Sequence, residues 1–238
     1  MKMKNPLRSF FRFCLDLLYP NRCPCCDTFL PWNVYICGDC KEKMRISPDD
    51  LCRKCGKAKE ECMCAVLPAY DEAIAVSYYE KEAKKGLIAM KASTSRNFGW
   101  YAGEQIGKWI LEQPDWMMTD GIVPVPMSFG KRMLRGYNQA EIIAEGIASV
   151  TNIPVRKHCL KKKHGFRAQH TLSAKERAEN IESFRSGNRD LRGYRLILCD
   201  DILTTGLTIN RCAEILKESG AETVYAAVAA TTCRKREE

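Results

Sequence analysis

Cysteine is concentrated in one short stretch near the N-terminus of the chain. Of the 14 cysteines in the sequence, nine lie between Cys23 and Cys64. Eight of them form short C-x2-C or C-x-C pairs: Cys23 with Cys26, Cys37 with Cys40, Cys52 with Cys55, and Cys62 with Cys64. Each pair can turn two sulfur atoms toward one point, and two pairs complete the tetrahedron of four thiolates that Zn²⁺ prefers. The spacing therefore predicts two structural zinc sites, with Cys25 as the spare cysteine.

The spacing does not determine how the pairs combine. Consecutive pairs would share an ion in the simplest arrangement, whereas an interleaved cross-brace would use the same eight ligands. The alternative to metal is a set of buried or redox-active cysteines. A redox C-x-x-C motif needs one pair, however, and leaves the other pairs of this segment unexplained. We therefore interpret the segment as a double zinc module.

The distribution of charge separates this module from the rest of the chain. Residues 1–66 carry 12 basic and 8 acidic side chains, and eight thiolates with two Zn²⁺ would bring the loaded module close to neutral. A zinc module that binds nucleic acid usually has a clear net positive charge. We therefore expect this one to support a neighbouring domain or to dock a partner protein. Most of the remaining basic excess lies between Arg156 and Arg177, where there are eight basic residues and one acidic residue.

Composition excludes several classes of protein. With 45% apolar and 28% charged residues, the chain can bury a sizeable core and is neither disordered nor collagen-like. It has no run of about 18 apolar residues, so no membrane span is expected. The apolar stretch near the N-terminus is interrupted by Arg12 and Asp16 and lacks a small-residue cleavage site, which argues against a signal peptide. We expect a cytoplasmic protein whose cysteines bind metal.

Periodicity and turn residues divide the chain into three parts. We expect an amphipathic helix within residues 1–19, the zinc module over residues 20–66, and a larger domain over residues 67–238. The helix is expected to pack on the protein rather than on a bilayer. In the larger domain the patterns predict strands at 72–79, 121–126, 194–199 and 223–230, and helices at 80–91, 97–111, 139–150 and 207–218, with a further helix beginning at Ser173. Alternating strands and helices indicate a mostly parallel α/β sheet.

The strand expected at 194–199 leads into residues that carry chemistry. It ends in Asp200 and Asp201, turns through Thr204-Thr205-Gly206, and enters a helix. In open α/β sheets, ligands bind where the carboxyl ends of strands meet such turns. The turn offers backbone N–H groups, hydroxyls and the positive end of a helix to a phosphate, and the acids suit ribose hydroxyls or Mg²⁺. The alternative is that a threonine only caps the helix while the acids are solvated.

These residues resemble the phosphoribosyl pyrophosphate (PRPP) signature of type I phosphoribosyltransferases. Over nearly the whole chain, the wider pattern is similar to that of the competence protein F (ComF) family. The matching motifs are the cysteine pairs, Val123-Pro124-Val125-Pro126, Arg135-Gly136-Tyr137-Asn138-Gln139, Gln169 with Leu172, Glu176-Arg177 with Asn180, and the signature itself. The resemblance implies a type I phosphoribosyltransferase-like α/β core behind a small zinc module. In bacteria it also implies a link to DNA uptake during natural transformation.

The resemblance also implies a role for each candidate residue. Asp200 and Asp201 would be the catalytic acids, holding the ribose 2′- and 3′-hydroxyls of PRPP bound with Mg²⁺. The residues expected around the 5′-phosphate are Thr204, Thr205, Gly206, Leu207 and Thr208. Lys91 matches the family's lysine before an aromatic residue, although Ala92 replaces that aromatic here. Arg135, with Lys131 and Arg132, is expected to meet pyrophosphate oxygens, and Arg177 to add a second clamp; the alternative for Lys131 and Arg132 is a solvated loop.

Three functions fit these expectations. The first is a Mg²⁺-dependent phosphoribosyltransferase whose acceptor the sequence does not identify. The second is a PRPP-binding adaptor or sensor that does not turn its ligand over. The third is a protein that handles single-stranded DNA through the basic segment, Arg156 to Arg177, although the same segment would also suit a lid over pyrophosphate. Competence proteins are the partners expected for the zinc module.

Overall fold

The computed structural model describes residues 20–44, 51–57, 59, 62, 68–163, 183–187 and 189–232. Several expectations fall outside these residues: the helix within residues 1–19, the helix beginning at Ser173, and most of the basic segment. Of the candidate ligands and binding residues, Cys64 and Arg177 also lie outside the described part. None of the described helices is long and apolar enough to cross a membrane.

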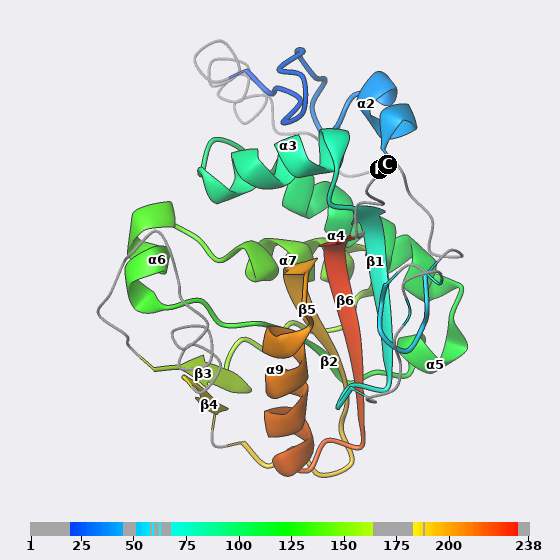
Figure 1. The fold of residues 1–238 in the computed structure, drawn as a ribbon, viewed down its shortest axis with the longest axis vertical. Helices are drawn as coiled ribbons and strands as arrows, with labels where there is room; N and C mark the ends of the chain where they lie inside the picture. Colours follow the sequence, from blue (N-terminus) through cyan, green and yellow to red (C-terminus); the bar gives the residue numbers. More distant parts are fainter. Residues whose placement is uncertain are drawn as a thin grey trace, which may run out of the picture.

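A parallel sheet forms the centre of the described part of the chain (Figure 1). Its strands are β1 (Glu72–Tyr78), β2 (Gly121–Pro124), β5 (Arg195–Leu203) and β6 (Thr223–Thr231), in the order β1-β6-β5-β2. All three pairings are parallel, and Ile197 of β5 lies between Ile122 of β2 and Tyr225 of β6. The strands read as nearly continuous apolar runs because the sheet is covered on both faces. The expected mostly parallel α/β sheet is confirmed.

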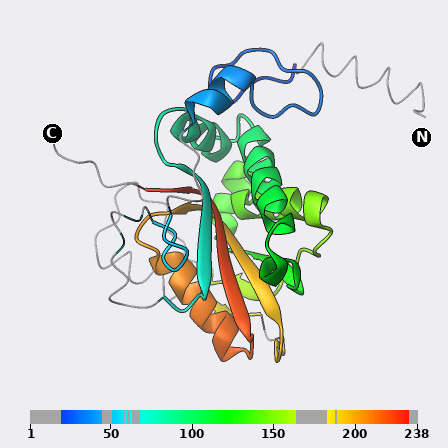
Figure 2. The ribbon, with the colours of Figure 1, turned by 90° about the vertical axis from the view of Figure 1, so that its right-hand side faces the viewer.

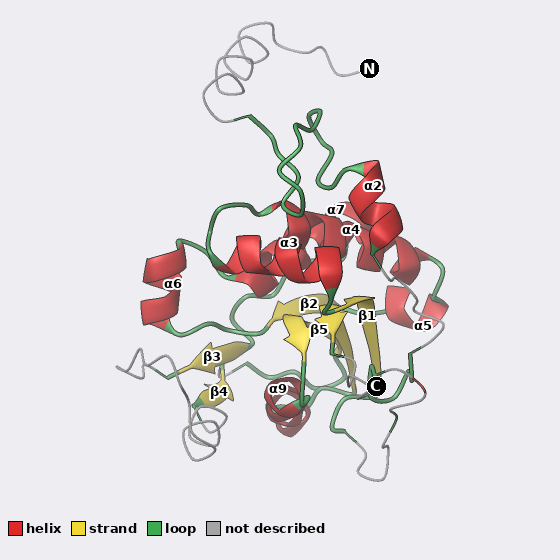
Figure 3. Cartoon of the chain, turned by 45° about the horizontal axis from the view of Figure 1, so that its top comes forward, coloured by secondary structure: helices red, strands yellow, loops and turns green. Residues whose placement is uncertain are grey.

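Helices pack on both faces of this sheet (Figures 2 and 3). On one face lie α3 (Lys81–Lys91), α4 (Asn97–Leu111) and α7 (Gln139–Thr151), and on the other lies α9 (Leu207–Glu218). Helices α4 and α7 approach closely because glycines meet at their crossing. A Cβ atom at Gly103 would collide with the carbonyl oxygen of Ile143 and with Gly146. This arrangement places the N-termini of α7 and α9 at the carboxyl edge of the sheet.

Some elements differ from the sequence-based expectations. Strand β5 continues past Cys199 to Leu203, so Asp200 and Asp201 lie within the strand rather than after it. The strand extends because β6 pairs with it over this length, with Asp200 opposite Val228. Short helices that were not expected are α2 (Gly38–Lys43), α5 (Pro114–Met117) and α6 (Phe129–Arg135).

A small antiparallel pair was also not expected. Strand β3 (Leu160–Lys162) lies in the basic segment, Arg156 to Arg177, and pairs with β4 (Phe184–Ser186), which lies beyond that segment. The apolar residues that anchor this pair, Leu160 and Phe184, are both buried. They lie far apart in the sequence, so no local alternation reveals either strand.

The first part of the zinc module packs against the helices of the core. Asn97, the first residue of α4, donates from Nδ2 to Asn21 Oδ1 at 2.7 Å and to the carbonyl oxygen of Arg22 at 3.0 Å. The rings of Tyr35 and Trp100 stack with their centroids 6.1 Å apart. The buried residues of this segment therefore belong to the same apolar core as α3 and α4.

Candidate functional site

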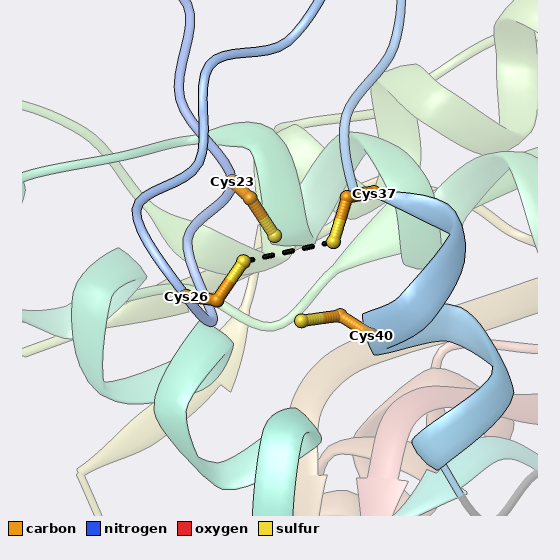
Figure 4. A group of neighbouring side chains, drawn as sticks. All are labelled: Cys23, Cys26, Cys37 and Cys40. Carbon is orange, nitrogen blue, oxygen red and sulfur yellow. Dashed lines mark hydrogen bonds between the residues drawn. The ribbon is translucent and has the colours of Figure 1, made fainter.

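Four cysteines of the first two pairs converge on one point (Figure 4). The Sγ atoms of Cys23, Cys26, Cys37 and Cys40 all lie within 4.8 Å of one another, and those of Cys26 and Cys37 are 3.6 Å apart. Thiolates that surround Zn²⁺ tetrahedrally at about 2.3 Å lie about 3.8 Å from each other. Cys23 and Cys26 come from a tight turn, in which Asp27 N–H bonds the Cys23 carbonyl at 2.9 Å. This group fits a structural zinc ion.

A second group forms from the later pairs. Cys52, Cys55 and Cys62 have sulfur atoms within 4.8 Å of one another, and the Sγ atoms of Cys55 and Cys62 are 3.9 Å apart. Cys64, the expected fourth ligand, lies outside the described residues. Gly56 follows Cys55 with φ +67°, and a Cβ there would collide with Ala73 and Leu203 of the core. The grouping corresponds to consecutive pairing of the cysteines rather than to an interleaved cross-brace.

Cys25 differs from its neighbours. It is buried and lies outside both groups of converging sulfur atoms. Burial raises the pKa of its thiol to about 12, and the nearby Cys23 adds to the rise. Its position outside both groups, rather than its pKa, agrees with its interpretation as the spare cysteine.

A cavity of about 250 Å³ lies at the carboxyl edge of the sheet. It is lined by side chains that come from separate parts of the sequence: Lys91 at the end of α3, Arg135 at the end of α6, Asp200 and Asp201 on β5, and Thr208 on α9. All of these are residues that the sequence singled out. The structure thus brings the two acids, two expected cations and one residue of the signature turn into a single site.

The two acids have different surroundings in this cavity. Asp201 accepts from Lys91 Nζ at 3.2 Å, so its charge is balanced by the end of α3. Asp200 Oδ1 accepts from the backbone N–H of Asp201 at 2.8 Å. Burial raises the pKa of the Asp200 carboxyl to about 7, and the charge of Asp201 contributes to this rise. Lys91 and Lys162 act in the opposite direction. Asp200 is therefore poised to change its charge near neutral pH.

Two further lysines line the cavity. Lys131 of α6 was grouped with Arg132 in the sequence, and the structure separates the two. Lys131 lines the cavity, whereas Arg132 donates to both carboxylate oxygens of Glu141, at 2.7 and 3.1 Å. Lys162 of β3 was missed as a site residue because its strand was missed. Its Nζ lies 4.2 Å from the ring centroid of Phe184, and burial lowers the pKa of its ammonium group.

The signature turn is placed differently from the acids. Thr204, Thr205 and Gly206 form the connection from β5 into α9, which begins at Leu207. Unlike Thr208, these four residues do not line the 250 Å³ cavity. Gly206, with φ +78°, is the N-cap of α9, and no side chain caps this helix. The alternative in which Thr204 or Thr205 caps the helix is therefore wrong. The exposed threonines and the uncapped first turn leave N–H and hydroxyl groups facing outward.

Hydrogen bonds hold the segment from Arg135 to Gln139 beside the cavity. Ser93 Oγ donates to the carbonyl oxygen of Arg135 at 2.8 Å, and the Tyr137 hydroxyl donates to that of Met90 at 2.6 Å. Asn138 Nδ2 donates to the carbonyl oxygen of Val125 at 2.9 Å. The end of α3 and the loop that follows it therefore position the cationic end of α6.

Two domain families match this chain. Residues 139–238 match the phosphoribosyl transferase domain family, and residues 14–69 match the double zinc ribbon domain family. With the parallel sheet and the cysteine groups, these matches define the class of protein: a type I phosphoribosyltransferase-like core behind an N-terminal double zinc ribbon.

Curated relatives narrow this class. The chain is 25% identical over 206 residues to Competence protein F of Haemophilus influenzae, covering 79% of this chain and 87% of that protein. It is 31% identical over 102 residues to Competence protein ComFC of Bacillus subtilis, covering 42% and 39%. It is 28% identical over 107 residues to DNA utilization protein YhgH of Salmonella typhi, covering 45% and 47%. The matches to ComFC and YhgH thus span less than half of those proteins. The chain belongs to the ComF family and carries that family's N-terminal zinc module.

Proposed function

We propose that this protein binds PRPP together with Mg²⁺ in the 250 Å³ cavity and acts as a phosphoribosyltransferase. The observation that carries the proposal is the convergence of two acids and several cations on one cavity beside the N-terminus of α9. PRPP has the same pattern of groups: anionic phosphates at both ends and hydroxyls between them. Asp200 and Asp201 would face the ribose hydroxyls, and the turn from Thr204 to Thr208 would hold the 5′-phosphate.

The charges around the cavity suit the chemistry of this ligand. Loss of pyrophosphate from C1′ leaves positive charge on the ribose, which the carboxylates of Asp200 and Asp201 would balance. Lys91, Lys131 and Arg135 would hold the leaving group in place, with Arg177 as a further proposed contact. Mg²⁺, when bound, would neutralise charge on the pyrophosphate. Zinc has a separate, structural role, for which we propose all eight paired cysteines as ligands.

We further propose that this activity serves DNA uptake. The relatives that the chain matches are named for competence and for DNA utilization. The zinc ribbon supports the core through Asn21 and leaves exposed aromatic side chains, Phe29 and Trp32, for a competence protein partner. The cytoplasmic location and the domain boundaries at residues 19 and 66 stay predictions.

One observation favours the second candidate, a PRPP-binding adaptor without turnover. Among the described residues that line the cavity, the aromatic ring is that of Phe184, which already faces Lys162. Phosphoribosyl transfer to a nucleobase would benefit from a free aromatic face for stacking. In the described part of the site, an acceptor base therefore has no free aromatic ring on which to stack.

Two measurements on the wild-type protein test this proposal. Calorimetry with PRPP and Mg²⁺ is expected to show saturable binding, and a pyrophosphate-release assay then separates the two candidates. Release that depends on an added acceptor, such as single-stranded DNA, supports the transferase. Binding without release supports the adaptor, and the absence of binding contradicts both.

A further inference from the structure

Gln139, the first residue of α7, has a buried amide group without a partner. Its residue surface is 2% exposed, and within the described part of the chain its Nε2 makes no hydrogen bond. The same side chain lines the cavity that holds Asp200 and Asp201. Because buried polar groups in folded proteins are nearly always hydrogen-bonded, the missing partner points to a ligand.

The neighbouring amide behaves differently. Asn138, which is also buried and lines the cavity, uses both ends of its side chain within the protein. Its Nδ2 donates to the Val125 carbonyl at 2.9 Å, and its Oδ1 accepts from Ala140 N–H at 3.2 Å as the N-cap of α7. Asn138 therefore has a structural role, and Gln139 is the amide of this pair that is left to bind a ligand.

The surroundings of Gln139 favour an anion. It lies at the N-terminus of a 13-residue helix, where the helix dipole is positive. The acid in the first turn, Glu141, is balanced by Arg132 at 2.7 Å and by Lys157 at 3.8 Å. Lys131 and Arg135 line the same cavity and add positive charge. A donor amide among these cations suits a phosphoryl oxygen.

We propose that Gln139 donates from its amide to a phosphoryl oxygen of the pyrophosphate group, in a subsite shared with Arg135 and Lys131. This inference rests on the proposed function. The two ends of the ligand would then contact two helices on opposite faces of the sheet. Thr208 of α9 would contact the 5′-phosphate, and Gln139 of α7 would contact the pyrophosphate. Asp200 and Asp201 on β5 would meet the ribose between them.

Two substitutions separate this role from a structural one. Gln139→Met keeps the length of the side chain and removes the donor, while Gln139→Glu keeps the shape and adds negative charge. Affinities for PRPP, inorganic pyrophosphate and ribose 5-phosphate, each with Mg²⁺, are measured by calorimetry. Gln105→Met on α4, which is away from the cavity, is the matched control.

We expect Gln139→Met to weaken PRPP and pyrophosphate binding about tenfold, and Gln139→Glu to weaken both further. Ribose 5-phosphate binding should stay within about twofold of wild type. Thermal unfolding provides a second readout: Gln139→Met should be at least as stable as wild type, because it removes an unpaired buried polar group.

Unchanged PRPP and pyrophosphate affinities in Gln139→Met, or an equal loss for ribose 5-phosphate, would overturn the inference. So would a marked drop in thermal stability, since it would assign the amide a structural partner. If the wild type binds pyrophosphate in a Gln139-dependent way but not PRPP, the subsite stands and the proposed function fails. If the wild type binds neither, both fail.

Discussion

Lys91 Nζ lies 3.2 Å from Asp201 Oδ2 and so ties the end of α3 to the carboxyl end of β5. The aromatic residue that the family places after this lysine is Ala92 here, yet the lysine still reaches the cavity. Its charge also favours the ionised form of Asp200, because it lowers a pKa that burial raises. Lys91 thus forms an ion pair with one acid and lowers the pKa of the other.

Binding of PRPP with Mg²⁺ is therefore expected to depend on pH near neutrality. Protonated Asp200 is a weaker hydrogen-bond acceptor for the ribose hydroxyls and a weaker partner for Mg²⁺ than the carboxylate, so affinity should rise as the pH increases through about 7. In Lys91→Met the loss of the cation favours the protonated carboxyl, which should move the midpoint of this rise to higher pH. Calorimetry between pH 5.5 and 8.5, roughly spanning that midpoint, provides the measurement, with Lys85→Met, an exposed residue of α3, as the control.

The same group affects stability in the opposite sense. The folded-state pKa of Asp200 lies above its unfolded value, so its contribution to stability is full at low pH and is lost as the pH rises through about 7. Asp200→Asn should remove this part of the pH dependence of thermal unfolding. For PRPP binding, an affinity that does not change across neutral pH in wild type, or a midpoint that does not shift in Lys91→Met, would contradict the assignment of this pH dependence to Asp200.

The cysteine groups predict a contrast between adjacent residues. Cys26→Ala should lose the first of the two expected zinc ions, whereas Cys25→Ala should keep both, since Cys25 lies outside the converging sulfur atoms. Metal analysis of the purified variants measures this. Because metal binding is coupled to folding, chelation should unfold the zinc module first. Full zinc content in Cys26→Ala, or none in wild type, would show that the first group is not a zinc site.

Gly206 predicts an effect that acts through the backbone. A Cβ atom there would have room, with Leu203 Cδ1 at 3.7 Å and the Tyr70 hydroxyl at 3.9 Å, but φ is +78°. Gly206→Val should therefore reduce the free energy of unfolding by about 1–2 kcal/mol and weaken PRPP binding by distorting the turn. Gly206→Asn should cost less in both respects, since Asn tolerates this conformation. Urea unfolding and calorimetry compare the two, and equal behaviour of Val and Asn would rule out a backbone cause.

Single-stranded DNA binding by the basic segment stays a prediction that the structure sharpens. Lys161 and Lys163 are exposed, whereas Lys162 lines the cavity. Lys161→Ala with Lys163→Ala should lower the slope of log affinity against log salt by about 1.4, if each contacts one phosphate. Lys162→Ala should instead weaken PRPP binding. A wild-type slope in the double variant would leave DNA contact to another part of the protein.

Much of the core was predictable because its signals are local. The helices at 97–111 and 207–218 were predicted with the bounds that the structure gives, since each carries an apolar stripe between clear turn residues. The acids and Thr208 were found because a buried strand, a turn and a helix follow one another in the sequence. Consecutive grouping of the cysteines was one of two open alternatives, and only the fold distinguishes them.

The rest of the site depends on contacts between distant residues. Lys162 enters the cavity because β3 pairs with β4, more than twenty residues further along the chain. Arg132 faces away because Glu141 on α7 binds it. Gln139 belongs to the motif Arg135-Gly136-Tyr137-Asn138-Gln139, but nothing in the sequence shows that its amide lacks a partner, since a glutamine after Asn138 also fits a helix start. Such features arise from packing and become visible only in three dimensions.

The affinity of PRPP for the Asp200→Asn/Asp201→Asn variant, measured by calorimetry with Mg²⁺, tests the central claim most directly. These substitutions keep the shape of the side chains on β5 and remove the charges that we propose to face the ribose hydroxyls. The exposed Asp190, which pairs with Arg192 at 2.6 Å away from the cavity, provides the control Asp190→Asn. We expect the double variant to lose at least about tenfold in affinity while the control binds like wild type. Wild-type affinity in the double variant would contradict the placement of PRPP in this cavity.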